Sequence, residues 1–180
     1  NNSTAIGFMS QNANTGLNNT SLGSNTLRNT GTGSYNTAVG YFAMNNNRGG
    51  TNNTAVGLQS LLDNQNGNAN TAIGRNALAA NTTGNANTAV GMNAMAANTT
   101  AANNSAFGNY TMPVNTTGTN NTAIGNISMY SNTTGGSNVG VGANSLQANT
   151  TGSYNTSVGV ACLDANTTGN ENTAVGKNAL

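Results

Sequence analysis

The chain has 180 residues, of which only 4% are charged and 4% aromatic, and it contains 40 Asn, 28 Thr, 24 Gly and no His. The formal net charge is +1, and the four basic residues are scattered singly, so no basic stripe is available for binding nucleic acid. Polar chains of low complexity are often disordered, because they bury too little apolar surface to offset the conformational entropy lost on folding.

An apolar residue followed by glycine recurs along the whole chain, and this regularity argues against disorder. The interval is 16 residues once and 17 residues every time after that. A one-residue slip would turn inward side chains outward, so the constant interval indicates that every repeat occupies the same place in a stack. The pairs are Ile6-Gly7, Leu22-Gly23, Val39-Gly40, Val56-Gly57, Ile73-Gly74, Val90-Gly91, Phe107-Gly108, Ile124-Gly125, Val141-Gly142, Val158-Gly159 and Val175-Gly176. The pattern predicts a solenoid with one coil per repeat.

Taken in chain order, the repeats form a single unit over residues 1–180. The first coil is one residue short, and the averaged later coil reads N-T-A-V-G-x-N-A-L-x-A-N-T-T-G-x-x. The chain begins with Asn rather than Met and ends inside a repeat, so we interpret it as a segment of a longer repetitive polypeptide. The coils start near Ser3, Asn19, Asn36, Asn53, Asn70, Asn87, Asn104, Asn121, Asn138, Asn155 and Asn172.

Each coil is expected to contain two short strands and no helix, because Asn, Thr and Gly are poor helix formers. The first strand is N-T-A-V, and the glycine that ends it suits a corner that needs a positive φ or has no room for a Cβ. The second is the x-A-L segment, as in 76–78 and 144–146, and N-T-T-G makes the return. The sequence therefore predicts an all-β fold, a parallel β-solenoid or β-roll with about eleven coils of 17 residues.

Stacked coils place identical side chains in ladders about 4.8 Å apart. We expect one polar column of asparagines, whose amides donate and accept along the axis. A column of like charges would repel at this spacing, which explains the scarcity of charged residues. The polar column contains Asn36, Asn53, Asn70, Asn87 and Asn104, and a second apolar column contains Leu61, Leu78, Met95 and Met112. The predicted core ladder contains Val39, Val56, Ile73, Val90, Phe107, Ile124, Val141, Val158 and Val175.

Both members of Ala89-Val90 and of Ala94-Met95 are apolar, although successive strand residues face opposite sides. One side fills the coil, and the other lies in water unless something covers it. We therefore expect self-association into a multichain rod, with end-to-end filaments as a further form of assembly.

Catalytic chemistry has few residues to use, so we expect neither an enzyme nor a cofactor or metal site. There is no imidazole, and the carboxylates are Asp63, Asp164 and Glu171. Asp63 and Asp164 are six coils apart, roughly 28 Å at the stacking distance, which is too far for an acid and base pair. No glycine-rich phosphate loop and no membrane-spanning run is present. Cys162 stands where other coils carry Ala or Ser, so we expect a small buried side chain.

Two surface features remain as candidate sites. The variable pairs after the corner glycines, such as Tyr41-Phe42 and Asn109-Tyr110, are candidate contacts for neighbouring chains, a surface glycan or a receptor. Leu58-Gln59 and Asn126-Ile127 are further pairs of this kind. The N-T-T turns match the N-x-S/T acceptor pattern. Their candidate glycan acceptors are Asn81, Asn98, Asn115, Asn132, Asn149 and Asn166.

The N-T-A-V-G and N-T-A-I-G segments resemble the head repeats of YadA-like trimeric autotransporter adhesins. The longer unit at 70–84 is similar to repeats in bacterial surface proteins and phage tail-fibre-like proteins. The resemblance covers essentially the whole chain and implies a left-handed β-roll, three chains around one axis, and an extracellular, cell-surface or virion fibre. The 17-residue unit is longer than the coil usual in those heads, and the stalk, coiled coil and anchor of the adhesins are absent.

Three classes of function are compatible with this pattern. The first is a non-catalytic structural fibre, or the shaft or head of an adhesin. The second is an ice-binding solenoid that uses a flat row of threonines. The third is a fibre-borne enzyme that degrades polysaccharide, which needs carboxylates clustered between chains. The row proposed for ice contains Thr82, Thr99, Thr116 and Thr133.

Overall fold

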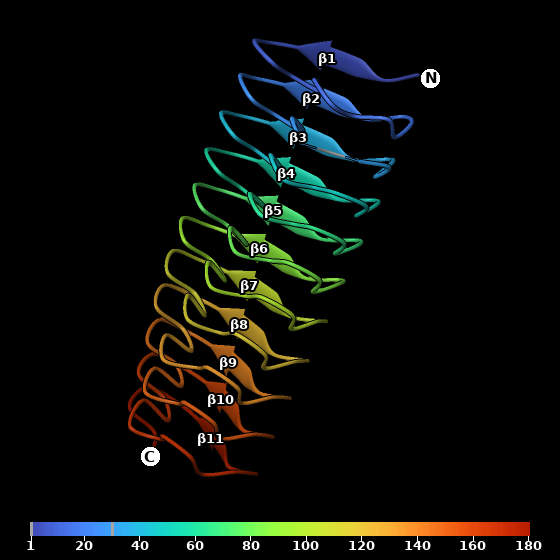
Figure 1. Cartoon of the computed structure of the whole chain (residues 1–180). Coiled ribbons are helices and arrows are strands. Elements are labelled where there is room, and N and C mark those ends of the chain that lie inside the picture. Colours follow the sequence, from blue (N-terminus) through green and yellow to red (C-terminus); the bar gives the residue numbers. More distant parts are fainter. Residues whose placement is uncertain (1, 30) are drawn as a thin grey trace.

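The computed structural model describes residues 2–29 and 31–180, and they form a rod of stacked coils (Figure 1). Eleven strands of three residues each make one parallel sheet, in which the spatial order is the order along the chain. No helix occurs in the described residues. The strands are β1 (Thr4–Ile6), β2 (Thr20–Leu22), β3 (Thr37–Val39), β4 (Thr54–Val56), β5 (Thr71–Ile73), β6 (Thr88–Val90), β7 (Ser105–Phe107), β8 (Thr122–Ile124), β9 (Val139–Val141), β10 (Thr156–Val158) and β11 (Thr173–Val175).

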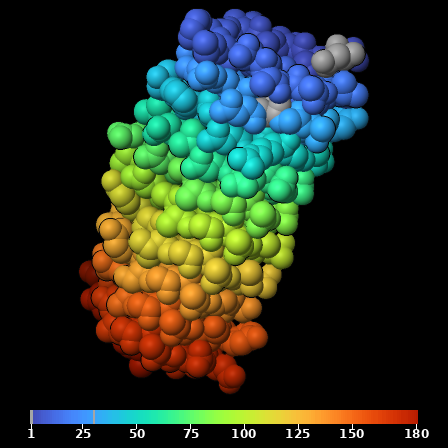
Figure 2. Space-filling view, viewed as in Figure 1, coloured from blue at the N-terminus to red at the C-terminus, as the bar shows by residue number. Residues whose placement is uncertain are grey.

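The strands pair in the register that the sequence period predicts. Thr71 lies beside Thr88, Ala72 beside Ala89 and Ile73 beside Val90. The short first coil keeps this register, since β1 and β2 also pair Thr with Thr. In Figure 2 the colour changes in successive bands from blue to red, so each coil lies between its two sequence neighbours. The predicted all-β parallel solenoid is confirmed.

The predicted second strand is wrong. Residues 75–80 form a turn-rich segment, here called a return segment, in which Asn76 and Leu78 have φ of 55° and 51°. Left-handed residues are not compatible with an extended strand. The backbone nevertheless bonds to both neighbouring coils, since Asn76 N–H donates to the Leu58 carbonyl and Leu78 N–H to the Ala94 carbonyl, each at 3.0 Å. The return segments thus form ladders without being strands.

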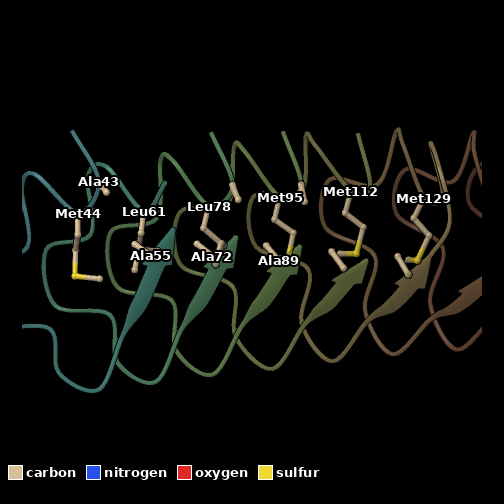
Figure 3. Packing of buried hydrophobic residues seen from close by; sticks show 14 of the residues in the cluster. Ala43, Met44, Ala55, Leu61, Ala72, Leu78, Ala89, Met95, Met112 and Met129 are labelled. Carbon is tan, nitrogen blue, oxygen red and sulfur yellow. The ribbon is translucent and has the colours of Figure 1, made fainter. Parts of the chain in front are cut away.

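The core is narrow and is filled from two sides. Each strand contributes its middle residue, which is alanine in most coils, and each return segment contributes a leucine or methionine. Figure 3 shows Leu78 and Met95 reaching across toward the strands that carry Ala72 and Ala89. These four side chains are completely buried. The predicted column of Leu61, Leu78, Met95 and Met112 is therefore confirmed as core.

The predicted core ladder is a true ladder, but it lies on the outside of the sheet. Ile73 is 40% exposed and Phe107 is 41% exposed, while the alanine before each of them is fully buried. Alternation along a strand sends neighbouring side chains to opposite faces. The narrow interior, already occupied by the leucines and methionines, leaves room for alanine but not for valine or isoleucine. The correction applies to Val39, Val56, Ile73, Val90, Phe107, Ile124, Val141, Val158 and Val175, all half-buried or exposed.

The corner after each strand requires glycine. Gly57 has a φ of 134°, a region that residues with a side chain rarely adopt. A Cβ built on Gly57 lies 2.7 Å from the carbonyl carbon and oxygen of Gly74 in the next coil. The close stacking of the corners therefore also excludes any side chain.

We predict that Gly57→Ala lowers the free energy of unfolding by about 2 kcal/mol or more, because both the backbone conformation and the contact with Gly74 oppose a Cβ. Gly176→Ala is the matched control, because Gly176 has a similar φ of 126° but a Cβ built on it lies 3.9 Å from its nearest neighbour, the Ala179 side chain. Its loss is expected to be clearly smaller. Urea unfolding followed by circular dichroism measures both, and equal losses would contradict the corner argument.

Candidate functional site: the outward strand face and the asparagine ladders

An asparagine directly precedes each strand from β2 onward, and these residues, here called the entry asparagines, close each coil. Asn70 Nδ2 donates to the Gly84 carbonyl at the end of the same coil, at 2.8 Å. Asn70 Oδ1 accepts from the backbone N–H of Asn87 at 3.0 Å and from Asn87 Nδ2 at 3.2 Å. The predicted polar column is confirmed. The entry asparagines are Asn19, Asn36, Asn53, Asn70, Asn87, Asn104, Asn121, Asn138, Asn155 and Asn172.

The asparagines of the return turns form a second inner ladder. Asn81 Nδ2 donates to Asn64 Oδ1 at 2.7 Å and to the Gly84 carbonyl at 3.0 Å, so both ladders converge on this carbonyl. Among the described residues, no buried side-chain nitrogen or oxygen lacks a hydrogen-bond partner. These turn asparagines are Asn47, Asn64, Asn81, Asn98, Asn115, Asn132, Asn149 and Asn166.

The second ladder corrects the prediction of glycan acceptors. An acceptor amide must be accessible, but all six candidate Nδ2 atoms donate two hydrogen bonds inside the coil, and only Asn166, near the end of the rod, is not fully buried. The N-T-T row is therefore a structural column and not a row of attachment sites. The correction covers Asn81, Asn98, Asn115, Asn132, Asn149 and Asn166.

We predict that Asn70→Ala lowers the free energy of unfolding by about 2–4 kcal/mol. The substitution leaves the buried Asn87 backbone N–H without its acceptor and removes one of the two amide donors to the Gly84 carbonyl, which keeps Asn81 Nδ2. Asn109→Ala is the control, because the Asn109 side chain is exposed and forms no hydrogen bond with another described residue. The measurement is equilibrium unfolding in urea. A loss at Asn70 no larger than at Asn109 would show that the ladder contributes no net stability.

The outward face of the strands carries a threonine column beside the apolar ladder. The first residue of each strand, such as Thr71, belongs to the threonine column, and the third, such as Ile73, belongs to the apolar ladder. None of these positions is charged in any coil. The strand threonines Thr37, Thr54, Thr71, Thr88, Thr122, Thr156 and Thr173 form no side-chain hydrogen bond with another described residue. Their hydroxyls are thus available to solvent or a partner.

The threonine row of the return turns, which the sequence suggests as an ice-binding row, does not offer free hydroxyls. Thr82 Oγ1 donates to the Thr99 carbonyl at 2.9 Å, and Thr116 Oγ1 donates to the Thr133 carbonyl at 3.1 Å. Thr99 and Thr133 donate in the same way to the following coil. These side chains therefore stabilise the return turns.

A polar groove of about 450 Å³ crosses the return turns of four coils. Asp63 is its only carboxylate, and Asp63 Oδ1 accepts from Asn46 Nδ2 at 2.7 Å. Asp164 lies six coils away, so no acid and base pair forms in the groove. Within residues 2–29 and 31–180, no group of three or more His, Cys, Asp or Glu side chains is placed to hold a metal ion. Cys162 is buried as predicted, and its Sγ lies 3.3 Å from the Ala174 carbonyl.

The variable pairs after the corner glycines separate into two kinds. Tyr41 and Phe42 contact each other edge to face, with ring centroids 4.5 Å apart. Tyr110 and Ile127 instead line a second groove of about 390 Å³, together with Tyr130 and Gln147. The sequence alone does not single out Tyr130 and Gln147, although both stand at the position that Ala79 and Ala96 occupy in other coils.

Comparison of the chain with models of protein families, with curated proteins and with solved structures finds no match. In the part of the chain that the structure describes, no helix has the length and apolar character needed to cross a membrane.

Proposed function

We propose that this chain is a non-catalytic structural segment of an extracellular fibre, or of the shaft or head of an adhesin, and that its copies associate through the outward faces of their strands. The observation that carries the proposal is the unbroken ladder of half-buried or exposed valine, isoleucine, leucine and phenylalanine along the sheet. A contiguous apolar surface of this kind is typical of an interface between proteins.

The geometry of the face favours copies of the same chain as partners. Eleven strands at about 4.8 Å intervals present a strip on the order of 50 Å long, with no charge to repel a second strip. β-branched residues in a regular row can interdigitate with the same row on a parallel copy. Association would bury Ile73 and Phe107, which a single rod leaves in water.

We propose three chains around one axis and a left-handed winding. This part of the proposal is supported by the resemblance of N-T-A-V-G to the repeats of YadA-like trimeric adhesins. Three flat faces turned toward a common axis would enclose the apolar ladders and leave the return segments outside. The cell surface or a virion is then the site where the fibre acts.

We predict that the protein has the mass of three chains in native mass spectrometry or sedimentation equilibrium, and that Ile73→Lys shifts it to the mass of one chain. Three lysines facing one axis would be brought together in an apolar environment. Thr83→Lys is the control, because Thr83 is exposed on the return turn. A single-chain mass for the unsubstituted protein, or a trimer unaffected by Ile73→Lys, would overturn the assembly.

The free hydroxyls of the strand threonines favour ice binding as a second candidate function. Thr54 and Thr71 stand in register on the outward face of the sheet, beside the apolar ladder. If this face binds ice, we predict thermal hysteresis that Thr71→Lys greatly reduces, measured by nanolitre osmometry. The two functions require the same face, so a stable trimer without hysteresis would reject this candidate.

A further inference from the structure

The groove lined by Tyr110, Ile127, Tyr130 and Gln147 lies on three successive return segments, and its volume of about 390 Å³ suits a small ligand. Backbone hydrogen bonds hold the three segments together. Ile127 N–H donates to the Asn109 carbonyl at 3.0 Å, and Ser131 N–H donates to the Gln147 carbonyl at 3.0 Å. The lining side chains are therefore carried on a rigid ladder.

Ile127 is held in a strained conformation within this groove. Its φ is 59°, and it is the only β-branched residue with a positive φ among the described residues. β-branched residues strongly disfavour this region, whereas asparagine tolerates it. Five of the other ten coils place asparagine here, and none of the remaining five places a β-branched residue. The asparagines are Asn25, Asn76, Asn93, Asn144 and Asn178. Stacking alone thus does not explain the isoleucine, and strain that the fold does not need points to a function.

The tyrosines of the groove are also larger than the residues at the same places in most other coils. Tyr110 stands where the preceding coil has Asn93, and Tyr130 stands where earlier coils have Ala79 and Ala96. Both tyrosine side chains remain more than a third exposed. Large side chains thus replace small or polar ones at neighbouring places in consecutive coils, which builds the groove.

We propose that this groove binds a neutral pyranose ring of a glycan. The tyrosines and Ile127 offer apolar surfaces for the C–H faces of a sugar, and Gln147 offers an amide that donates and accepts hydrogen bonds to hydroxyl groups. No Lys, Arg, Asp or Glu lines the groove, so no partner is present for a sialic acid or a sulfate. This inference rests on the proposed role as an extracellular fibre, since it names the ligand of such a fibre.

The groove remains accessible if the strand faces are covered by other copies. The leucine or methionine of a return segment points inward to the strand, as Met95 does toward Ala89 in Figure 3. The return segments therefore lie across the core from the outward strand face. Sugar binding and chain association use opposite sides of the rod.

The test is a titration of the full chain with neutral oligosaccharides of glucose, galactose and N-acetylglucosamine, and with sialylated and sulfated counterparts, followed by NMR shifts and by tyrosine fluorescence. The chain has five tyrosines and no tryptophan, so the fluorescence reports directly on tyrosine contacts. We expect at least one neutral probe to bind, with no gain in affinity from the added negative charge.

The groove variants copy residues from other coils, so that loss of binding is separated from loss of folding. Tyr110→Asn with Tyr130→Ala is expected to weaken binding at least tenfold. Ile127→Asn is expected to weaken it several-fold without lowering the unfolding midpoint. Tyr154→Ser, which copies Ser137 at an exposed place outside the groove, is expected to leave the affinity unchanged.

Absence of binding to every neutral probe, or binding that the groove variants leave intact, would overturn the proposal. So would preference for an anionic probe, or occupation of the groove by a hydrophobic peptide in competition with the sugars. The mass measurement keeps the two proposals apart. A trimer that binds no sugar rejects only the glycan site, and a single chain that binds sugar rejects only the trimeric assembly.

Discussion

Each side chain in this solenoid lies next to the equivalent side chain of the coils above and below, and this like-on-like stacking constrains the whole structure. A buried column of identical residues is stable only if the residue is compatible with itself. Asparagine meets this condition, because its amide both donates and accepts, as Asn70 and Asn87 do. A carboxylate column would have only acceptors and like charges, and an ammonium column only donors. The asparagine content and the scarcity of charge follow from the same requirement.

The asparagine ladders also replace ordinary backbone pairing where the coil closes. The Gly84 carbonyl accepts from Asn70 Nδ2 and from Asn81 Nδ2, so one buried acceptor is shared by the two ladders. This arrangement joins the end of the coil to its start and leaves little room inside for apolar side chains. The core is therefore limited to an alanine, a small residue and one leucine or methionine in most coils. The larger apolar residues of the strands are placed outside, and the exposed ladder is a consequence of the narrow interior.

The sequence period was sufficient to predict the first strand of each coil, its register, the entry asparagines and the buried leucine and methionine column, but it wrongly indicated a second strand in each coil. It was not sufficient to decide whether Ala89 or Val90 points inward, because both are apolar and hydrophobic alternation does not distinguish them. The size of the side chain decides which of the two points inward, because the interior has little space. That space is set by the return segment, where Leu78 and Met95 adopt left-handed conformations that local propensity does not predict. The N-T-T pattern likewise does not indicate whether the amide of Asn81 is exposed or buried, and the structure shows that it is buried. Of the residues that line the second groove, only Tyr110 and Ile127 belong to the variable pairs that the sequence indicates. Tyr130 and Gln147 join them only when three coils are stacked.

In a repeat fold of this kind, the side chains that stabilise the stack are different from the side chains that distinguish one coil from another. Columns inside the rod tolerate little variation, because a change in one coil alters the contacts of both neighbours. Ala101 shows the narrow range allowed, since it replaces the glycine of other coils while its carbonyl still accepts from Asn87 Nδ2 at 2.8 Å. Side chains that project outward from the stack are free of this constraint, so any specific recognition of a partner would depend on them. Ile127 goes further, because it accepts backbone strain that asparagine at the same place in other coils avoids. If the groove binds a sugar as proposed, this backbone strain is the cost of presenting an apolar side chain to the ligand.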